Sequence, residues 1–487
     1  MRHLIITIAG LSIFILPSVP WAQSTPTSPA NFPEIGNPQS DLSAPSFSAE
    51  QPLPLPNGSQ ITLRQAVAIA LQFHPIIAEV AAQTSAAEER VGEARSYLGP
   101  QLNAVSEYLR STDNGIGNTS YYNPFGLFPR ISGTNHDQSP LDTSQNWDTS
   151  NNYVGGATVS QFLFDFGRRR SFVEQRRFEA EAAGYDQTLA KVSLIFEVSQ
   201  RYFNVLQAKQ LVRVYEQAIE QRKFHLHEAE VKANAGLRPQ LDVYMTKAAL
   251  ERAQLYLVEA KNSEDDAVAA FDNALGLGGR TPNYELVDVL TYSKINDKLD
   301  SLVLEAFKYR PDMKALYAQA RAMGAQVQEF RSDYLPTVNA VAGYSAMGTG
   351  LPAANNFNAG IVITWPIFNS FLTTHEVQET KYRQKALESQ IEDLRQRIIL
   401  QVKTAYLDWV ASLQRIVRAE EALAASRAEL ELAEKRYAAG LADIVELEDA
   451  QRNYTGDDAA YANALYGFSI ARAAVDEATA RGLKDLD

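Results

Sequence analysis

Two long stretches of the chain carry apolar residues at helical spacing and contain few glycines and no prolines. They run from about residue 168 to 234 and from about 370 to 438. At about 1.5 Å per residue, each would span roughly 100 Å. The apolar positions are sparse, as where Leu423, Leu430 and Tyr437 step by seven. Such narrow seams predict side-by-side helix contacts with solvent on both broad faces.

A glycine follows each of these long helical patterns. Gly236 and Gly440 both stand in the sequence Ala-Gly-Leu, and an apolar pattern resumes shortly after each. A glycine just past the end of a helical pattern is a C-cap signal, and the resumed pattern starts a returning helix. Each copy therefore predicts the tip of a helical hairpin.

Comparison of the chain with itself reveals a tandem duplication. At an offset of 236 residues, positions within 63–105 match positions within 299–341 without a gap. At an offset of 204, positions within 151–237 match positions within 355–441. The 32-residue difference falls in the Gly-, Asn- and Ser-rich stretch 114–152. The first repeat therefore has a longer loop at this one place.

Both repeats predict the same order of elements: a first helix, two strands, a very long helix and a shorter returning helix. The first helix spans 62–97 in one repeat and 299–334 in the other. We place the repeats at 61–277 and 299–483, with an irregular connector at 278–298.

The strand-like runs alternate between apolar and polar residues, most clearly from Phe357 to Ile367. One face carries Phe357, Ala359, Ile361, Ile363, Trp365 and Ile367, and the other carries Asn356, Asn358, Gly360 and Thr364. Phe357 and Trp365 lie about 26 Å apart on an extended strand, which suits an apolar membrane band with aromatic girdles. Tyr344 and Tyr153, on neighbouring runs, extend the predicted lipid-facing girdle.

An isolated alternating strand more often belongs to a soluble hairpin, with one face on a core. Here four such strands occur without another candidate core for them. Four strands cannot close a membrane barrel, which needs about eight, and an open edge is not tolerated in lipid. The chain must then oligomerise, and two, three or four copies would give eight, twelve or sixteen strands.

The N-terminus predicts export. Residues 1–22 combine an early arginine, an apolar run and small residues near the end, as in a secretory signal peptide. Residues 23–60 are rich in Ser, Asn, Gln and Pro and predict a disordered or extended lead. Beyond the signal no apolar run of transmembrane-helix length occurs.

The composition and the motifs of the chain argue against several classes of function. The net charge of -13 argues against nucleic acid or an anionic membrane surface as a partner. With no cysteine, the chain has neither a disulfide framework nor a thiol nucleophile. His225 and His227 are two positions apart on a helix and diverge, and the glycines at 276–279 do not follow a strand in a βαβ unit. We therefore predict no enzyme activity, no cofactor and no metal site.

The duplication, the strand pairs, the long helices and the Ala-Gly-Leu tips together resemble the TolC-like family of outer-membrane efflux channels. The likeness covers nearly all of 62–483, including the strand ends Gln161 to Gly167 and Trp365 to Asn369. It implies a mostly α fold with membrane β structure. A homotrimer would form one twelve-stranded β-barrel, four strands per chain, continued by a long α-helical barrel in the periplasm.

The resemblance also implies roles at the tips. The gate tyrosine falls on Tyr437 and its acidic partner on Asp242, while an acidic constriction ring falls on Glu446 and Asp449. A second gate pair, an Arg with a polar partner, falls instead on Ala442 and Leu241, which implies a lock with fewer polar links. The docking surface for a periplasmic adaptor falls on the two tip turns, at Gly236, Leu237, Gly440 and Leu441.

The resulting prediction is a passive duct in the outer membrane, serving efflux or type I secretion. An inner-membrane transporter and a periplasmic adaptor would be its partners, and outer-membrane lipid would surround its strands. Two other classes remain open from the residues alone. One is a soluble periplasmic coiled-coil scaffold, which explains the helices but leaves the strands unused. The other is a periplasmic enzyme, but no sequence motif supports it.

Overall fold

The structure, a computed structural model, describes residues 58–112, 149–277, 284–288, 295, 297–348 and 354–481. The predicted signal peptide, nearly all of the predicted lead and most of the 114–152 loop lie outside the described residues. Much of the predicted connector does so too.

The described part of each repeat contains four helices whose lengths match those of their counterparts. The helices are α1 (Leu63–Phe73), α2 (Pro75–Ser96), α3 (Arg168–Asn234) and α4 (Gln240–Ala274), then α5 (Leu299–Tyr309), α6 (Pro311–Ser332), α7 (Leu372–Ala438) and α8 (Ile444–Ala478). In both repeats they have 11, 22, 67 and 35 residues. The predicted duplication is confirmed.

The single first helix predicted for each repeat is wrong, because a proline divides it into two. Pro75 and Pro311 occupy the first position of α2 and α6. Proline lacks an amide hydrogen and disfavours helical geometry in the residue before it. The predicted helices 62–97 and 299–334 therefore bend at these prolines, by 49° between α1 and α2. In the described residues no single helix has the length and apolarity to cross a membrane, although α1 and α2 pass that test as a bent pair.

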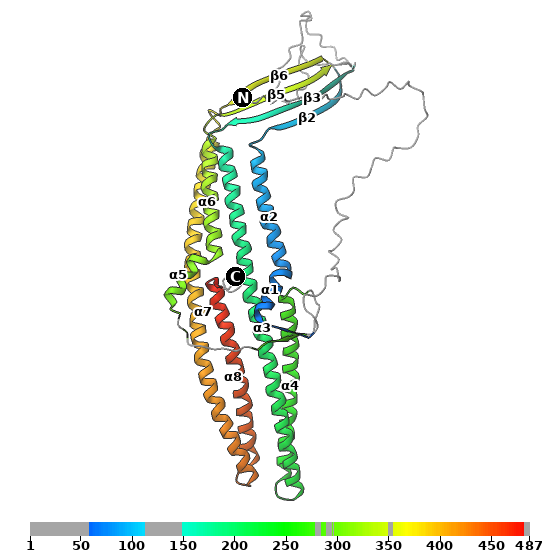
Figure 1. Cartoon of the computed structure of the whole chain (residues 1–487), viewed down its shortest axis with the longest axis vertical. Coiled ribbons are helices and arrows are strands. Elements are labelled where there is room, and N and C mark those ends of the chain that lie inside the picture. Colours follow the sequence, from blue (N-terminus) through cyan, green and yellow to red (C-terminus); the bar gives the residue numbers. More distant parts are fainter. Residues whose placement is uncertain are drawn as a thin grey trace, which may run out of the picture. The chain divides into compact units, whose positions relative to one another are not determined.

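Four strands form one antiparallel sheet in the order β2-β3-β5-β6 (Figure 1). Their bounds are β2 (Gln101–Thr112), β3 (Thr149–Phe164), β5 (Thr337–Gly348) and β6 (Ala354–Thr364). The four strands were predicted, but the run to Ile367 was too long: β6 ends at Thr364. Pro366 has no amide hydrogen to donate to a neighbouring strand, so Trp365 and Ile367 lie beyond the ladder.

The register places the predicted apolar residues on one face of this sheet. Tyr344 pairs with Phe357 and Tyr153 with Tyr108, and the pairing of β3 with β5 puts all four on the same face. The exposed large side chains of this face are Leu102, Tyr108, Val159, Tyr344, Phe357, Ile361 and Ile363, whereas the other face carries the buried hydroxyls of Thr158 and Ser345. One face of the sheet is thus apolar and left uncovered by the part of the chain that the structure describes.

A second, two-stranded sheet was not predicted. β1 (Ser59–Ile61) pairs in parallel with β4 (Tyr284–Leu286). The hydroxyl of Tyr202 in α3 lies 3.1 Å from the carbonyl oxygen of Ile61 and 2.6 Å from that of Val287. These strands close the hydrophobic core that α1, α3 and α4 build, so they fix α3 beside α1 part-way along its length.

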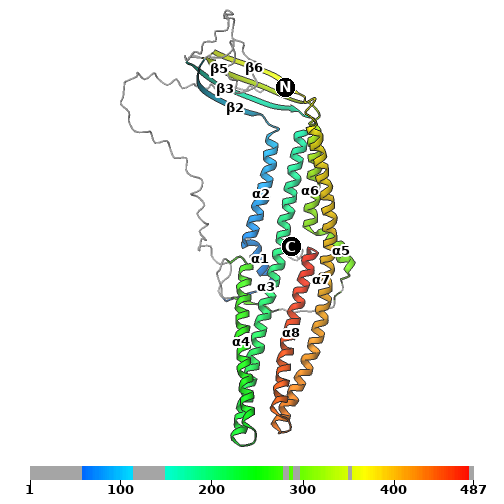
Figure 2. The ribbon, with the colours of Figure 1, turned by 180° about the vertical axis from the view of Figure 1, so that it is seen from behind.

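The long helices pack as two hairpins, α3 with α4 and α7 with α8, and both views show each pair side by side (Figure 2). α3 also contacts α8, which joins the two hairpins. Near the tip of the second hairpin the predicted seam is confirmed: Leu430, Ala433 and Tyr437 are buried against Ile444 and Leu447. Widely spaced apolar residues hold these helices, as the sparse pattern predicts.

Candidate functional site at the helical tips

Two glycine turns close the hairpins at the end away from the four-stranded sheet (Figure 1). Gly236 and Gly440 have φ angles of +73° and +76°, which glycine adopts without a Cβ clash. The amides of Leu237 and Leu441 donate to carbonyl oxygens five residues earlier, at 2.9 and 2.8 Å, as in a Schellman cap. Both leucine side chains are more than 70% exposed, at 74% and 73%. The predicted tips are confirmed, and each presents an apolar side chain to solvent.

The predicted gate residues, Tyr437 and Asp242, come from opposite hairpins and lie close together. Tyr437 is 0% exposed and Asp242 is also buried. Burial, followed by the negative charge of Asp242, raises the pKa of Tyr437 to about 12. The carboxylate of Asp242 lies close enough to raise the pKa of the phenol, but the two groups are not in hydrogen-bonding geometry. Within the described residues the Tyr437 hydroxyl and Asp242 Oδ2 have no hydrogen-bond partner.

Two basic residues that the sequence did not single out hold the second tip. Arg238, in the first tip turn, donates from Nη2 to the carbonyl oxygen of Ala442 at 2.7 Å. Lys232, at the end of α3, lies 3.4 Å from the carbonyl oxygen of Tyr437. Both cations also lie over the Tyr437 ring, 4.9 Å from its centroid for Arg238 Cζ and 4.6 Å for Lys232 Nζ. Basic residues on either side of Gly236 were the only available signal.

The predicted ring residues each pair with an arginine in the same hairpin. Glu446 lies 2.8 Å from Arg436, and Asp449 lies 3.0 Å from Arg452. All four side chains are 42% exposed or more, so these pairs are solvated and hold the carboxylates only weakly. The i,i+3 spacing of Asp449 and Arg452 is a local signal for one of these pairs, whereas Arg436 and Glu446 meet across the tip turn.

A polar seam joins the hairpins above the tips; it comprises Gln221, Arg222 and His225 of α3 with Glu448 and Gln451 of α8. Arg222 and Glu448 form an ion pair at 3.1 Å with side chains 11% and 10% exposed, and Gln451 donates to Gln221. Burial raises the pKa of Glu448 and lowers that of Arg222, even though each partner's charge acts in the opposite direction. Desolvation therefore exceeds the attraction within this pair.

His225 is the titratable member of the seam. It is 4% exposed, and neither ring nitrogen has a hydrogen-bond partner in the described part of the chain. Nε2 lies 3.5 Å from Glu434 of α7. Burial is the largest cause and lowers the pKa of His225, whereas the charges of Glu434 and Glu228 raise it and the charge of Arg222 lowers it further. From the sequence, His225 was a candidate only for a metal site, as a ligand beside His227.

Acidification below about pH 6.5 is expected to destabilise the hairpin contact through His225. The folded pKa lies below the ordinary value of 6.5, so the folded state binds this proton less well than the unfolded state. The contribution is complete above about pH 6.5 and is lost as the pH falls toward the folded pKa, with a slope of at most about 1.4 kcal/mol per pH unit.

The measurement is the guanidinium unfolding midpoint of the full chain at about pH 7.5 and about pH 5.5. His225→Gln should reduce the acid-induced shift, whereas His227→Gln, at an exposed position two residues away, should retain it. An unchanged shift in His225→Gln would contradict the assignment.

The four predicted girdle residues occupy the two ends of the sheet. Tyr344 and Phe357 face each other across β5 and β6 and are exposed. Tyr153 is half-buried because its ring packs on Tyr108 at 5.1 Å. Trp365 lies at the helical end and donates from Nε1 to a backbone carbonyl of the turn after α6 at 3.1 Å. Aromatic rings with one polar contact suit an interface between apolar and aqueous surroundings.

Comparison with known proteins identifies this architecture. The family described as outer membrane efflux protein matches residues 66–277 and 302–481, one segment for each repeat. The chain belongs to the outer membrane efflux protein family. The TolC-like resemblance and the fold class predicted from the sequence are thereby confirmed.

Individual relatives agree with this membership. Outer membrane protein TolC of Escherichia coli is 23% identical over 421 residues, covering 82% of this chain and 78% of TolC. Protein CyaE of Bordetella pertussis is 24% identical over 354 residues, covering 71% and 73%. A crystal structure of CusC superposes with a TM-score of 0.72 at 18% identity, covering 88% of this chain and 98% of CusC.

Family membership shows in which cellular compartment the tips lie. The protein is an outer-membrane efflux channel with most of its mass in the periplasm. The helical hairpins with their tips belong to its periplasmic part. The family consists of channels rather than enzymes.

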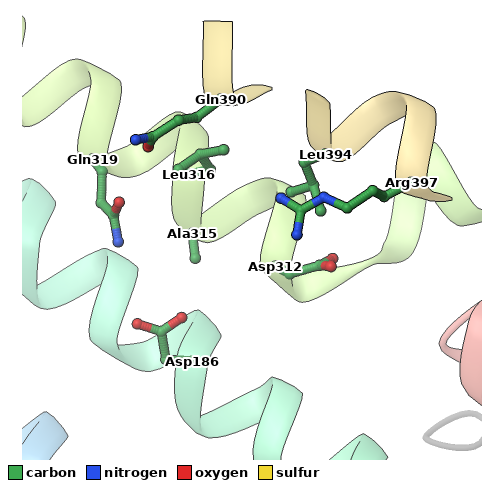
Figure 3. A pocket seen from close by; sticks show the side chains of 8 residues that line it. All are labelled: Asp186, Asp312, Ala315, Leu316, Gln319, Gln390, Leu394 and Arg397. Carbon is green, nitrogen blue, oxygen red and sulfur yellow. The ribbon is translucent and has the colours of Figure 1, made fainter. Parts of the chain in front are cut away.

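This efflux protein also has a polar hollow of about 240 Å³ between α3, α6 and α7 (Figure 3). Its lining includes Asp186 and Asp312, and burial raises the pKa of Asp186. Arg397, also in the lining, pairs with Asp393 at 3.0 Å. In the described ranges no cluster of three or more His, Asp or Glu side chains has the geometry to hold a metal ion. We assign no ligand to the hollow.

Proposed function

We propose that three copies of the chain form an exit duct, in which a twelve-stranded barrel continues into a periplasmic barrel of helices. The main support is the four-stranded sheet. Its outer strands β2 and β6 each pair on one side only within the described residues, and one face exposes apolar side chains. Unpaired strand edges are not tolerated in lipid, so sheets from several chains must join. Three copies supply twelve strands, which lies within the range of membrane barrels.

In this assembly the repeats, 61–277 and 299–483, would each supply one strand pair and one tip. The apolar face would contact outer-membrane lipid. Tyr153, Tyr344 and Phe357 would form the girdle at one interface and Trp365 that at the other, which agrees with their places at the two ends of the sheet.

The tips would form the closed end of the duct. Tyr437 and Asp242 would act in the gate, because they lie buried where the two hairpins of one chain meet. Glu446 and Asp449 would form the constriction ring, with three copies of each converging on the axis and attracting cations. Opening would separate the hairpins without any chemical step.

The exposed tip leucines would bind a periplasmic adaptor, which would connect the duct to an inner-membrane transporter. Gly236 and Gly440 shape the turns that expose Leu237 and Leu441. Leu237→Asp combined with Leu441→Asp should abolish in-cell crosslinking to the adaptor, while the amount of channel in the outer membrane stays unchanged. Crosslinking at the wild-type level would place the docking surface elsewhere.

Planar-bilayer recording tests the duct and its ring together. The purified protein should conduct ions, and a trivalent cation added on the tip side should block the current. Glu446→Ala with Asp449→Ala should weaken this block by about tenfold or more, because six carboxylates leave the ring. Arg436→Gln should strengthen it by freeing Glu446. Unaltered block in the carboxylate variant would remove both residues from the ring.

The coiled-coil scaffold predicts a different behaviour. A soluble periplasmic protein would be released as a monomer without detergent. The exposed apolar face of the sheet argues against this, since large uncovered apolar patches mark membrane or protein contacts.

A further inference from the structure

The contact between the two tips of one chain depends on cations from the first hairpin and on the backbone and one ring of the second. Arg238 bonds the carbonyl oxygen of Ala442, and Lys232 approaches that of Tyr437. Both cations lie within 5 Å of the centroid of the Tyr437 ring. We propose that Arg238, assisted by Lys232, is the lock that holds the tip closed, and that Tyr437 acts in it through its ring rather than its hydroxyl.

The geometry of the Tyr437 side chain favours its ring as the locking group. The hydroxyl has no hydrogen-bond partner within the described residues, although it is buried next to Asp242. The ring, by contrast, is buried and meets two half-buried cations, and cation–π attraction strengthens as the partners lose solvent. A Tyr437→Phe substitution keeps this ring and removes only the unpaired hydroxyl.

Arg238 makes the firmer of the two cationic links. Its bond to the Ala442 carbonyl is charge-assisted and 2.7 Å long, and Ala442 itself is buried. Lys232 is further from its carbonyl and also pairs with Glu228 on its own helix at 2.7 Å. Separation of the hairpins must therefore break this charge-assisted bond, which is about twice as strong as one between neutral groups.

The location of this bond answers a question that the sequence raised. Ala442 takes the position to which the resemblance assigns the arginine of a second gate pair, so that pair is missing. In this chain the guanidinium comes from the opposite tip, at Arg238, and reaches the backbone of the same position. Because a backbone carbonyl is the acceptor, the side chain at 442 does not need to be polar.

The inference rests on the proposed function of the tips as a gate, and single-channel recording tests the two separately. The variants are Arg238→Gln, Tyr437→Leu, Tyr437→Phe and, as a matched control, Lys247→Gln. Lys247 is exposed on α4 near the same tip and takes no part in the lock. We expect the open probability to rise about tenfold or more in Arg238→Gln and in Tyr437→Leu. It should stay within about threefold of wild type in Tyr437→Phe and Lys247→Gln.

Each of the following outcomes would contradict a different part of the proposal. If Tyr437→Leu opens the channel and Arg238→Gln does not, Arg238 is not the lock. If Tyr437→Phe opens it as strongly as Tyr437→Leu, the hydroxyl and Asp242 form the lock. Opening in Lys247→Gln equal to that in Arg238→Gln would mean a general charge effect. If neither wild type nor any variant conducts, the proposed duct itself fails.

Discussion

Ile361→Arg is expected to prevent assembly of the protein in the outer membrane. Ile361 lies on the apolar face of β6, midway between Phe357 and Trp365, and is 67% exposed. A charge at the centre of the lipid-facing band of a membrane barrel costs about 2–4 kcal/mol. In an assembly of three copies this cost arises three times. The total is then comparable to the whole free energy of unfolding of a typical domain.

The control for this substitution lies on the same strand. Asn356 belongs to the opposite, polar face, where it pairs with Ser345, so Asn356→Arg should assemble almost as wild type does. The measurement is the amount of heat-sensitive oligomer in the outer-membrane fraction. Normal assembly of Ile361→Arg would show that this face does not contact lipid.

Arg222→Leu is expected to destabilise the protein by about 3 kcal/mol per chain, since it leaves the buried carboxylate of Glu448 without its partner. The double variant, Arg222→Leu with Glu448→Leu, should regain most of that loss or all of it. The physical reason is that desolvation outweighs attraction in this pair, as the opposite pKa shifts of the two groups indicate. A packed apolar pair removes both buried charges.

Guanidinium unfolding of the detergent-solubilised protein, followed by circular dichroism, measures both variants. The exposed pair Arg418 and Glu421, on α7, provides a control, and Arg418→Leu should change the midpoint little. A double variant as unstable as Arg222→Leu alone would show that the ion pair itself stabilises the contact between the hairpins.

The sequence predicts the long elements well, because each has a local cause. Gly236 and Gly440 end the long helices, and the absence of proline allows 67 residues to continue without a break. The tandem repeat fixes the order of elements twice over. Pro75 also carries a local signal for the break, since proline favours the first position of a helix, and the prediction of one continuous helix overlooks it.

Features that depend on pairing across the fold were not predictable in the same way. β1 and β4 have three residues each and meet from about 225 positions apart, so neither shows a periodic pattern. His225 faces Glu434 only because α3 and α7 come together in one rotational phase. Arg238 lies in a turn, where the sequence does not determine which backbone oxygen its side chain reaches. The gate pair was located through family resemblance, but not the cations that surround it.

We propose that three chains complete one channel, because a sheet of four strands cannot close into a membrane barrel alone. Native mass spectrometry of the detergent-purified full chain, after export, tests this claim most directly. We expect a single assembly of three chains. A monomer that persists in detergent, or an assembly of any other number of chains, would contradict it.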